Sequence, residues 1–314
     1  MRNLISVVVP IFNEAPSLPE LHRRLTGVLR PLHTPFELVF VDDGSTDDTR
    51  QTLSTLTPLR AIHLKRNYGQ TIALATGIES ARGDTIIVID GDLENDPDDI
   101  PRLLKKMDEG YDVVSGWRQR RWENAAFRRR LPSLVANYAI ARLSGLAIHD
   151  FGCTLKAYRA EFLKNIPFSG NMHRLLLAYV ARQGAKIIEI PVNFTPRKHG
   201  TSHYGAKRIL EVPIDMLAYY FFEKYHNRPL YFFGAAGFIS FSLSILVFIL
   251  MLVLRFYGGL TFIQTPLPIL AVFFAMIAAQ FVLMGLIAEL VYRFSKHDRP
   301  IAIREYIKDE ASRG

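Results

Sequence analysis

The sequence predicts an α/β domain with a doubly wound, mostly parallel sheet, followed by a hairpin of two membrane-spanning helices. Two observations support this fold class. Over the first half of the chain, short apolar runs typical of strands alternate with stretches of helical spacing. Toward the C-terminus, residues 230–292 are nearly free of charge, whereas residues 1–229 have the composition of an ordinary α/β domain.

Strand and helix signals follow one another along the α/β domain. Strands are expected at residues 7–10, 36–41, 61–64, 85–89 and 111–115, and helices at 17–29, 69–81, 98–108 and near 125–145. The turn DDGSTDDT after the second strand also resembles a helix start, with Ser45 or Thr46 available as the N-cap. Ligands of a doubly wound sheet bind beyond the carboxyl ends of its strands, so the site is expected there.

The membrane-spanning hairpin rests on two uncharged runs. Residues 232–254 are long enough to cross the hydrocarbon core as a helix, and Pro266 and Pro268 mark the start of a second span. Lysines and arginines precede the first span and follow the second, whereas the loop between them holds only Arg255. The positive-inside rule then places both ends in the cytoplasm. The alternative is a buried hairpin in a soluble core.

Charge and cysteine content limit the classes of partner and cofactor. The formal net charge of +8 points to an anionic partner, which leaves nucleic acid, a membrane surface and phosphorylated ligands open. The single cysteine, Cys153, excludes an internal disulfide and a cysteine-rich metal site. The N-terminal segment has only a short apolar run and is not a signal peptide, so the α/β domain is expected to stay cytosolic.

Acidic clusters follow two of the predicted strands. Asp90 and Asp92 flank Gly91 directly after an apolar strand, where two carboxylates can converge on one hard divalent cation such as Mg²⁺ or Mn²⁺. Glu94 offers a third oxygen. Such a cation would bridge the phosphates of a nucleotide ligand. The alternative is an ordinary turn, since Asp and Gly are common turn residues.

The first two strand ends suit a nucleotide. Asp42 and Asp43 can accept hydrogen bonds from a ribose or from a uracil N–H, although a capped turn is the alternative. Pro10, Asn13 and Glu14 would form another wall of the same pocket. No G-x-G-x-x-G follows the first strand, which disfavours a dinucleotide site.

Five segments taken together resemble a known family. They are VVVPIFNE (7–14), VDDGSTD (41–47), RNYGQ (66–70), DGDLENDPD (90–98) and DFGCTLKAYR (150–159). As a set they resemble family 2 glycosyltransferases with the GT-A fold, over roughly residues 4–205. More narrowly, they are similar to polyprenyl-phosphate glycosyltransferases, the group that includes dolichyl-phosphate mannose synthases, bacterial undecaprenyl-phosphate glucosyltransferases and aminoarabinose transferases.

The resemblance implies a set of site residues. Nucleotide-sugar contacts are expected from Pro10, Asn13, Glu14, Asp42, Asp43, Asp90 and Gly91. Metal ligation by Asp90 and Asp92 follows from the family's D-x-D motif, and Glu94 stands where the family often has glutamine. Asp92 and Asp150 are the expected catalytic residues. An acceptor phosphate is already largely anionic at neutral pH, so Asp150 is expected to position it or to act as a weak base. The alternative is an acidic loop residue.

Basic residues provide the expected phosphate contacts. The segment 117–130 carries six arginines and one glutamate, for which nucleic-acid binding and a solvated face are the alternatives. Its position after the strand behind the metal site favours phosphate binding, which the guanidinium fork suits. A second segment, 194–204, resembles a family loop that closes over the donor pyrophosphate, with His203 where lysine or arginine is usual. The expected phosphate or acceptor ligands are Arg118, Arg128, Arg129, Arg159, Arg197 and Ser202.

The resemblance and the apolar runs together predict the organisation of the chain. We expect a GT-A catalytic domain at 1–205, an amphipathic interfacial helix at 206–229, transmembrane helices at about 231–254 and 267–291 within 230–292, and a cytoplasmic tail at 293–314. This describes an integral protein of the inner, cytoplasmic membrane with its catalytic domain and both termini in the cytoplasm. A homo-oligomer is compatible with it.

The predicted reaction is transfer of a hexose, with inversion, from a nucleotide sugar to a polyprenyl phosphate. UDP-glucose and undecaprenyl phosphate are the leading substrates by resemblance. The alternatives are a GDP-mannose-dependent mannose synthase, an aminoarabinose transferase and, in a different class, a non-catalytic scaffold that binds a nucleotide sugar. A processive polysaccharide synthase is disfavoured, since Q-x-x-R-W and further spans are missing from the sequence. Nucleic-acid binding would explain the charge but not the hairpin.

Overall fold

The computed structural model describes residues 4–119, 121, 137–138, 140–142, 144–164, 166, 175–196, 221, 224–225, 228–259 and 261–294. The chain divides into two compact units, Met1–Asp215 and Met216–Gly314.

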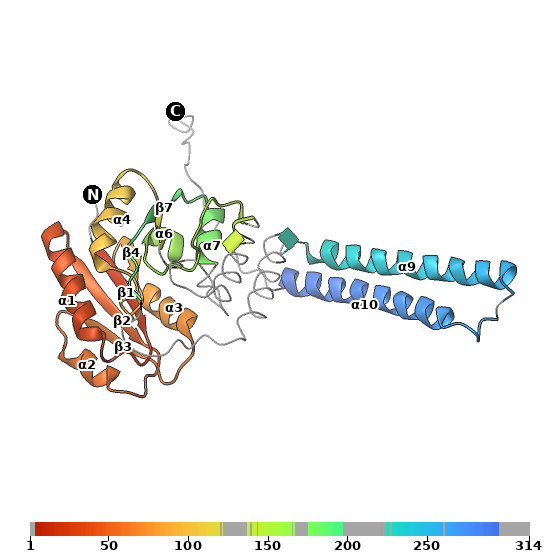
Figure 1. Cartoon of the computed structure of the whole chain (residues 1–314), viewed down its shortest axis with the longest axis horizontal. Helices are drawn as coiled ribbons and strands as arrows, with labels where there is room; N and C mark the ends of the chain where they lie inside the picture. Colours follow the sequence, from red (N-terminus) through yellow and green to blue (C-terminus); the bar gives the residue numbers. More distant parts are fainter. Residues whose placement is uncertain are drawn as a thin grey trace, which may run out of the picture. The chain divides into compact units, whose positions relative to one another are not determined.

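A seven-stranded mixed sheet forms the centre of the first unit (Figure 1). Its strands lie in the order β3-β2-β1-β4-β6-β5-β7. The strands are β1 (Ile5–Ile11), β2 (Phe36–Asp42), β3 (Arg60–His63), β4 (Thr85–Val88), β5 (Val113–Trp117), β6 (Lys156–Arg159) and β7 (Ile187–Pro191). Only β6 is antiparallel to its neighbours, β4 and β5, so the other described strands all run in one direction. The predicted mostly parallel sheet is confirmed.

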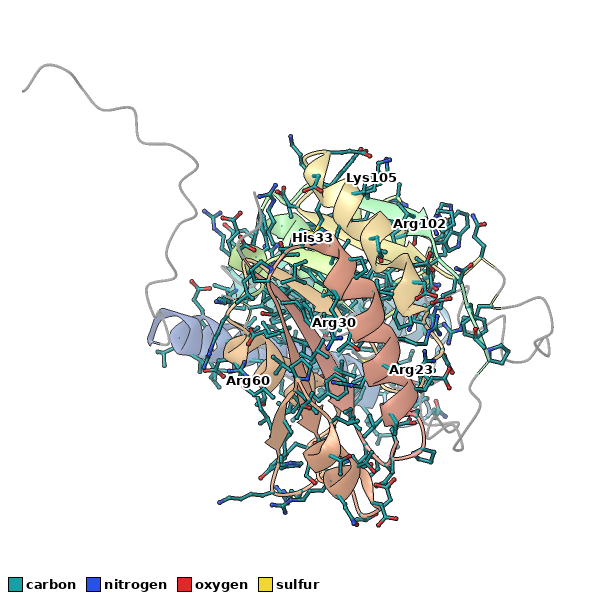
Figure 2. The ribbon with its side chains drawn as sticks, turned by 90° about the vertical axis from the view of Figure 1, so that its left-hand side faces the viewer. Arg23, Arg30, His33, Arg60, Arg102 and Lys105 are labelled. Carbon is teal, nitrogen blue, oxygen red and sulfur yellow. The ribbon has the colours of Figure 1, made fainter. Side chains whose placement is uncertain are left out.

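Helices cover both faces of this sheet. They are α1 (Leu18–Leu29), η1 (Arg30–Leu32), α2 (Thr49–Thr55), α3 (Gln70–Ser80), η2 (Pro97–Asp99), α4 (Ile100–Asp108), α6 (Ala160–Leu163) and α7 (Leu176–Arg182). The buried leucines of α1 recur at helical spacing and pack in one core with Val7, Val9 and α4. Figure 2 shows Arg23, Arg102 and Lys105 on the outer side of α1 and α4, so part of the positive charge is solvated surface.

Helix α3 packs on the opposite face through a glycine. A Cβ at Gly77 would lie 2.4 Å from Cγ1 of Val8 and 3.1 Å from Cγ2 of Val41. Only a residue without a side chain therefore lets α3 approach β1 and β2 this closely. The helix begins at Gln70, which places that side chain at the carboxyl end of the neighbouring strands.

The predicted elements agree with the observed ones to within a few residues, with several exceptions. Strands β6 and β7 and helices α6 and α7 were not predicted. The N-cap of α2 is Asp48 and not Ser45 or Thr46, so that part of the prediction is wrong. The helical stretch expected near 125–145 lies mostly outside the residues that the structure describes.

Two long apolar helices make up the described part of the second unit. They are α9 (Pro229–Tyr257) and α10 (Leu267–Phe294), which Figure 1 shows side by side. Both are long and apolar enough to cross a membrane, with mean hydropathy of 2.7 and 2.5 in their most apolar windows. Most of those residues are exposed, unlike the core helix of a soluble protein. The expected interfacial helix and tail lie almost wholly beyond the described residues.

Small residues hold this helix pair together. Ser244 donates its hydroxyl to the backbone oxygen of Ala271 at 2.7 Å. A Cβ at Gly237 would lie 3.2 Å from the backbone oxygen of Ala278, so the helices approach closely there as well. Small residues at a helix contact are typical of helix pairs in membranes.

Candidate active site

The predicted acidic strand ends meet at one edge of the sheet. Strands β2, β1 and β4 are adjacent and parallel, so the residues that follow them lie side by side. This edge carries Asn13, Asp42, Asp43 and Asp90 on adjacent strand ends. Pro10 lies inside β1, where it is buried and in register with Val41 of β2.

Asp42, which is buried, pairs with the exposed His63 at the ends of β2 and β3. Oδ2 of Asp42 lies 2.9 Å from Nδ1 of His63, and Oδ1 accepts the backbone N–H of Ser45 at 2.9 Å. Burial alone would raise the pKa of Asp42, but the hydrogen bonds from Ser45 and His63 outweigh it and lower that pKa. Asp42 is therefore an ionised anchor for the loop that follows β2.

Asp43 holds a second loop. Its two carboxylate oxygens accept the backbone N–H groups of Tyr68 and Gly69, each at 2.8 Å. Burial raises the pKa of Asp43 in spite of these two bonds. Gly44, with φ of +70°, would place a Cβ 2.4 Å from the backbone carbon of Arg66, so only glycine fits between the two loops.

Asn13 connects the first strand end to the same loops. Its backbone N–H donates to Oγ of Ser45 at 2.9 Å, and its side-chain oxygen accepts the N–H of Thr46 at 2.8 Å. Asn13 has φ of 55°, the left-handed region that asparagine tolerates better than most residues. A cavity of about 490 Å³ opens beside these loops, lined in part by Phe12, Asp42, Ser45, Arg50, His63, Arg66 and Asn67.

Glu14 and Gly91 lie between the first strand end and the D-x-D motif. Ser17 donates its hydroxyl to the backbone oxygen of Gly91 at 2.7 Å and to that of Glu14 at 2.9 Å. A Cβ at Gly91 would come within 3.4 Å of Ile11, so the motif packs closely on β1. The sheet edge is thus a connected set of loops, and the predicted nucleotide residues supply many of the connections.

The D-x-D carboxylates lie next to each other at the end of β4. Asp90 accepts a hydrogen bond from Nε2 of Gln70 at 2.9 Å, and Asp92 accepts the backbone N–H of Glu94 at 3.0 Å. Burial, and next the charge of Asp92, raise the pKa of Asp90 to about 7. Bringing two carboxylates together in this way is unfavourable unless a cation accompanies them.

A hard divalent cation fits this arrangement. The available donors are carboxylate oxygens, which Mg²⁺ and Mn²⁺ prefer, and the charge of the cation would offset the repulsion between Asp90 and Asp92. Within the described part of the chain, no three His, Cys, Asp or Glu side chains are close enough together to hold a metal ion. Part of a coordination shell would therefore come from phosphate oxygens and water.

Arg118 and Asp150 form a buried ion pair beside these carboxylates. Nε and Nη2 of Arg118 donate to the two oxygens of Asp150 at 2.8 and 3.1 Å. Burial alone would raise the pKa of Asp150, but the adjacent Arg118 lowers it. The third nitrogen, Nη1, lies 3.9 Å from Oε2 of Glu94. Arg118 is thus shared between the D-x-D loop and Asp150, with Asp150 the nearer partner.

The turn that carries Asp150 is fixed by residues around it. Arg121 lies 4.0 Å from Asp150, and a Cβ at Gly152 would come within 3.4 Å of Arg118. Lys156, at the start of β6, is buried and donates to the backbone oxygens of Phe151, at 3.1 Å, and of Cys153. Burial lowers the pKa of Lys156.

One predicted phosphate ligand, Arg159, is not brought to this site. Arg159 lies in register with Thr85, at the amino end of β4, and pairs with Asp112 at 3.0 Å. Because β6 runs antiparallel, it carries Arg159 to the edge opposite the D-x-D motif, so the prediction for Arg159 is wrong. Arg128, Arg129, Arg197 and Ser202 lie outside the described residues.

Sequence reasoning did not assign a role to three residues that the structure places here. They are His63, Gln70 and Glu189. Gln70 stands within a segment that carried the family resemblance, which is a usable signal. His63 and Glu189 lie in ordinary strand sequences, and only the fold brings them to the site.

Comparison with solved structures shows the fold. Glucosyl-3-phosphoglycerate synthase of Mycobacterium tuberculosis, solved with Mn²⁺ and UDP-glucose, superposes with a TM-score of 0.54 at 22% identity, covering 70% of this chain and 78% of that chain. The same enzyme with Mn²⁺, UDP and phosphoglyceric acid gives a TM-score of 0.56 at 21% identity, covering 70% and 78%. The likeness confirms the GT-A fold.

Sequence comparison shows the family. The model of glycosyl transferase family 2 matches residues 6–166. The dodecaprenyl-phosphate galacturonate synthase of Rhizobium johnstonii is 37% identical over 98% of this chain and 90% of its own length. An undecaprenyl-phosphate 4-deoxy-4-formamido-L-arabinose transferase of Pseudomonas syringae pv. syringae is 36% identical, over 92% and 86%. The chain belongs to glycosyl transferase family 2, and it is a glycosyltransferase, as the resemblance predicted.

Proposed function

We propose that this glycosyltransferase moves a sugar from a nucleotide sugar to a polyprenyl phosphate at the cytoplasmic face of a membrane. The observation that carries the proposal is the similarity of nearly the whole chain, apolar helices included, to two groups of enzymes named for polyprenyl-phosphate acceptors. An acceptor with a long hydrocarbon tail stays in the bilayer, so an enzyme anchored there meets it without extracting it.

The proposed chemistry is one in-line displacement. A non-bridging oxygen of the lipid phosphate attacks the anomeric carbon of the sugar, and the bond from that carbon to the donor phosphate breaks. The electron pair leaves with the nucleoside diphosphate, so the configuration is inverted. The cavity lined in part by Asp42 and His63 would hold the nucleoside, and the D-x-D loop would face the diphosphate.

Asp90 and Asp92 would hold the divalent cation, with Glu94 close by. When bound, Mg²⁺ or Mn²⁺ offsets the charge that develops on the leaving diphosphate. Arg118 and Arg121 add fixed positive charge at the same place, and the guanidinium group suits phosphate oxygens. These side chains need no rearrangement to oppose the developing charge, which is the basis of electrostatic catalysis.

Asp150 is proposed to position Arg118 and not to act as a base. Both of its oxygens already accept hydrogen bonds from Arg118, and its pKa is lowered, which makes it a weak proton acceptor. The lipid phosphate needs no base, because it is largely ionised at neutral pH.

The identity of the transferred sugar can be tested with a small set of candidate donors. The relatives are named for galacturonate and for formamido-arabinose, which places these two beside UDP-glucose in the set of donors to test. A GDP-mannose donor is the alternative that changes the nucleotide. The catalytic domain is proposed to face the cytoplasm, together with both ends of the apolar hairpin. The basic residues that flank the hairpin agree with this orientation.

The test is transfer of labelled sugar from a panel of UDP-sugars and GDP-mannose to undecaprenyl phosphate by the purified full-length protein in detergent. Wild type and Asp92→Asn are compared with and without Mn²⁺. We expect metal-dependent transfer from one donor in wild type and a loss of at least about 10²-fold in the variant. Tight binding of UDP without transfer from any donor would instead favour the non-catalytic scaffold.

A further inference from the structure

Glu189 is a buried carboxylate that has no part in the chemistry proposed above. It lies in β7, in register with Ser115 of β5, and its side chain is 5% exposed. Its Oε1 accepts the backbone N–H of Asp150 at 2.9 Å, and both of its oxygens accept that of His149, at 3.1 and 3.0 Å. It therefore binds the backbone of the turn that carries Asp150.

The side chain of His149 adds to this contact. Its Nδ1 lies 2.8 Å from Oε2 of Glu189, and its ring stacks on Trp117 with the centroids 4.3 Å apart. The far end of the turn is held separately, because Lys156 binds the backbone oxygens of Phe151 and Cys153. Loss of Glu189 would consequently release the first two residues of the turn and leave the rest in place.

The orientation of Asp150 decides which partner Arg118 takes. The paired hydrogen bonds from Nε and Nη2 are a bidentate contact, which tolerates little rotation of the carboxylate. Glu94 is the other carboxylate beside Arg118, with 3.9 Å between Nη1 and Oε2. If Asp150 turns away, Arg118 can move onto Glu94 and compete there with a cation.

We propose that Glu189 is a positioning residue of the active site. Through the backbone of His149 and Asp150 it keeps Arg118 paired with Asp150 and off Glu94, and it thereby supports cation binding at the D-x-D loop. The inference rests on the proposed function only in the role given to the cation and to Arg118.

The test uses the purified full-length protein and two substitutions of Glu189. Glu189→Ala removes the acceptor, whereas Glu189→Gln keeps an oxygen that can accept both backbone N–H groups. Binding of Mn²⁺ in the presence of UDP is measured by calorimetry, and kcat is measured for sugar transfer. We expect Glu189→Ala to weaken Mn²⁺ binding by about 10- to 100-fold, with a comparable fall in kcat, the range typical of residues outside the ligand set that support a metal site. Glu189→Gln should stay close to wild type.

Glu37 offers a matched control. Its carboxylate also accepts a backbone N–H, from Arg82 at 2.6 Å, and a hydroxyl, from Ser6 at 2.6 Å, but it lies at the opposite end of the sheet. Glu37→Ala should lower stability without changing Mn²⁺ binding. A purely structural role for Glu189 predicts the same result for Glu189→Ala, and that outcome would overturn the proposal.

Arg118→Lys tests whether the effect passes through Arg118. If it does, adding Glu189→Ala to Arg118→Lys should cause little further loss, whereas independent effects would multiply. The two proposals fail separately. Absence of transfer to any polyprenyl phosphate contradicts the proposed function, while weakened Mn²⁺ binding in Glu189→Ala alone would still support the positioning role.

Discussion

Three aspartates of the active site have different environments. Asp42 accepts hydrogen bonds from Ser45 and His63, and Asp150 is paired with Arg118, so both have a lowered pKa. Asp90 instead has a buried site next to Asp92, which raises its pKa to about 7. Asp42 and Asp150 therefore stabilise the surrounding structure when ionised, and Asp90 does not.

The raised pKa of Asp90 leads to a prediction about stability. The folded state binds a proton at Asp90 more tightly than the unfolded chain does, so the stability of the metal-free fold falls as the pH rises from the ordinary aspartate pKa of 3.8 to about 7. Asp90→Asn should therefore stabilise the metal-free protein, by on the order of 1–3 kcal/mol at pH 8.5 and by much less at pH 5. Chemical unfolding at the two pH values measures this. A variant that is less stable than wild type at both would contradict it.

Removing the charge of Asp150, unlike that of Asp90, should lower the stability of the fold. Asp150→Asn leaves a buried guanidinium without its charged partner, which should lower the free energy of unfolding by about 3 kcal/mol. The matched control is Asp112→Asn, which breaks the exposed pair with Arg159 and should cost less than about 1 kcal/mol. If the two substitutions lowered the free energy of unfolding by equally small amounts in urea, the Arg118–Asp150 pair would not be the strong buried interaction described here.

At the scale of secondary-structure elements, alternating patterns predicted β1 to β5 and the helices between them closely, because the apolar runs of β1, β2 and β4 are buried in the core. β6 escaped prediction because Lys156 and Arg159 give a short strand with charged ends, and only its place between β4 and β5 makes it a strand.

In the active site, too, residues marked by a local sequence pattern were predicted, and residues placed only by the fold were not. Residues at or just beyond the carboxyl ends of parallel strands, such as Asp42 and Asp90, were placed correctly on one edge, since parallel strands end together. Arg159 was misplaced because its strand is antiparallel. Glu189 was not identified because nothing local to its strand indicates that it binds a turn far away in the sequence.

The contact between α3 and the sheet yields a prediction at this scale. Gly77→Ala would place a methyl group 2.4 Å from Val8, so we expect a loss of about 1–3 kcal/mol in the free energy of unfolding. Gly27→Ala is the control, because a Cβ at that exposed position of α1 meets nothing within 4 Å. It should be neutral or stabilising by up to about 1 kcal/mol. Equal effects of the two substitutions would mean that α3 does not pack on β1 as described.

At the scale of the whole molecule, a catalytic unit is joined to a pair of apolar helices that the proposed function places in the bilayer. The membrane topology can be tested by labelling introduced cysteines, because the native Cys153 should react little. Cys153 is buried, and burial raises its pKa to about 11. With a membrane-impermeant maleimide on intact cells, Thr261→Cys in the hairpin loop should be labelled, and Ser312→Cys only after permeabilisation. The reverse pattern would contradict the proposed orientation.

The central claim is that the sugar alone, and not a sugar phosphate, passes to the lipid. The measurement that tests it most directly uses a donor labelled with ³²P in the β-phosphate and with ¹⁴C in the sugar, incubated with undecaprenyl phosphate and Mn²⁺. We expect ¹⁴C in the lipid and all ³²P in released nucleoside diphosphate. Transfer of both labels to the lipid would contradict the proposed displacement, because the bond broken would then lie between the two donor phosphates.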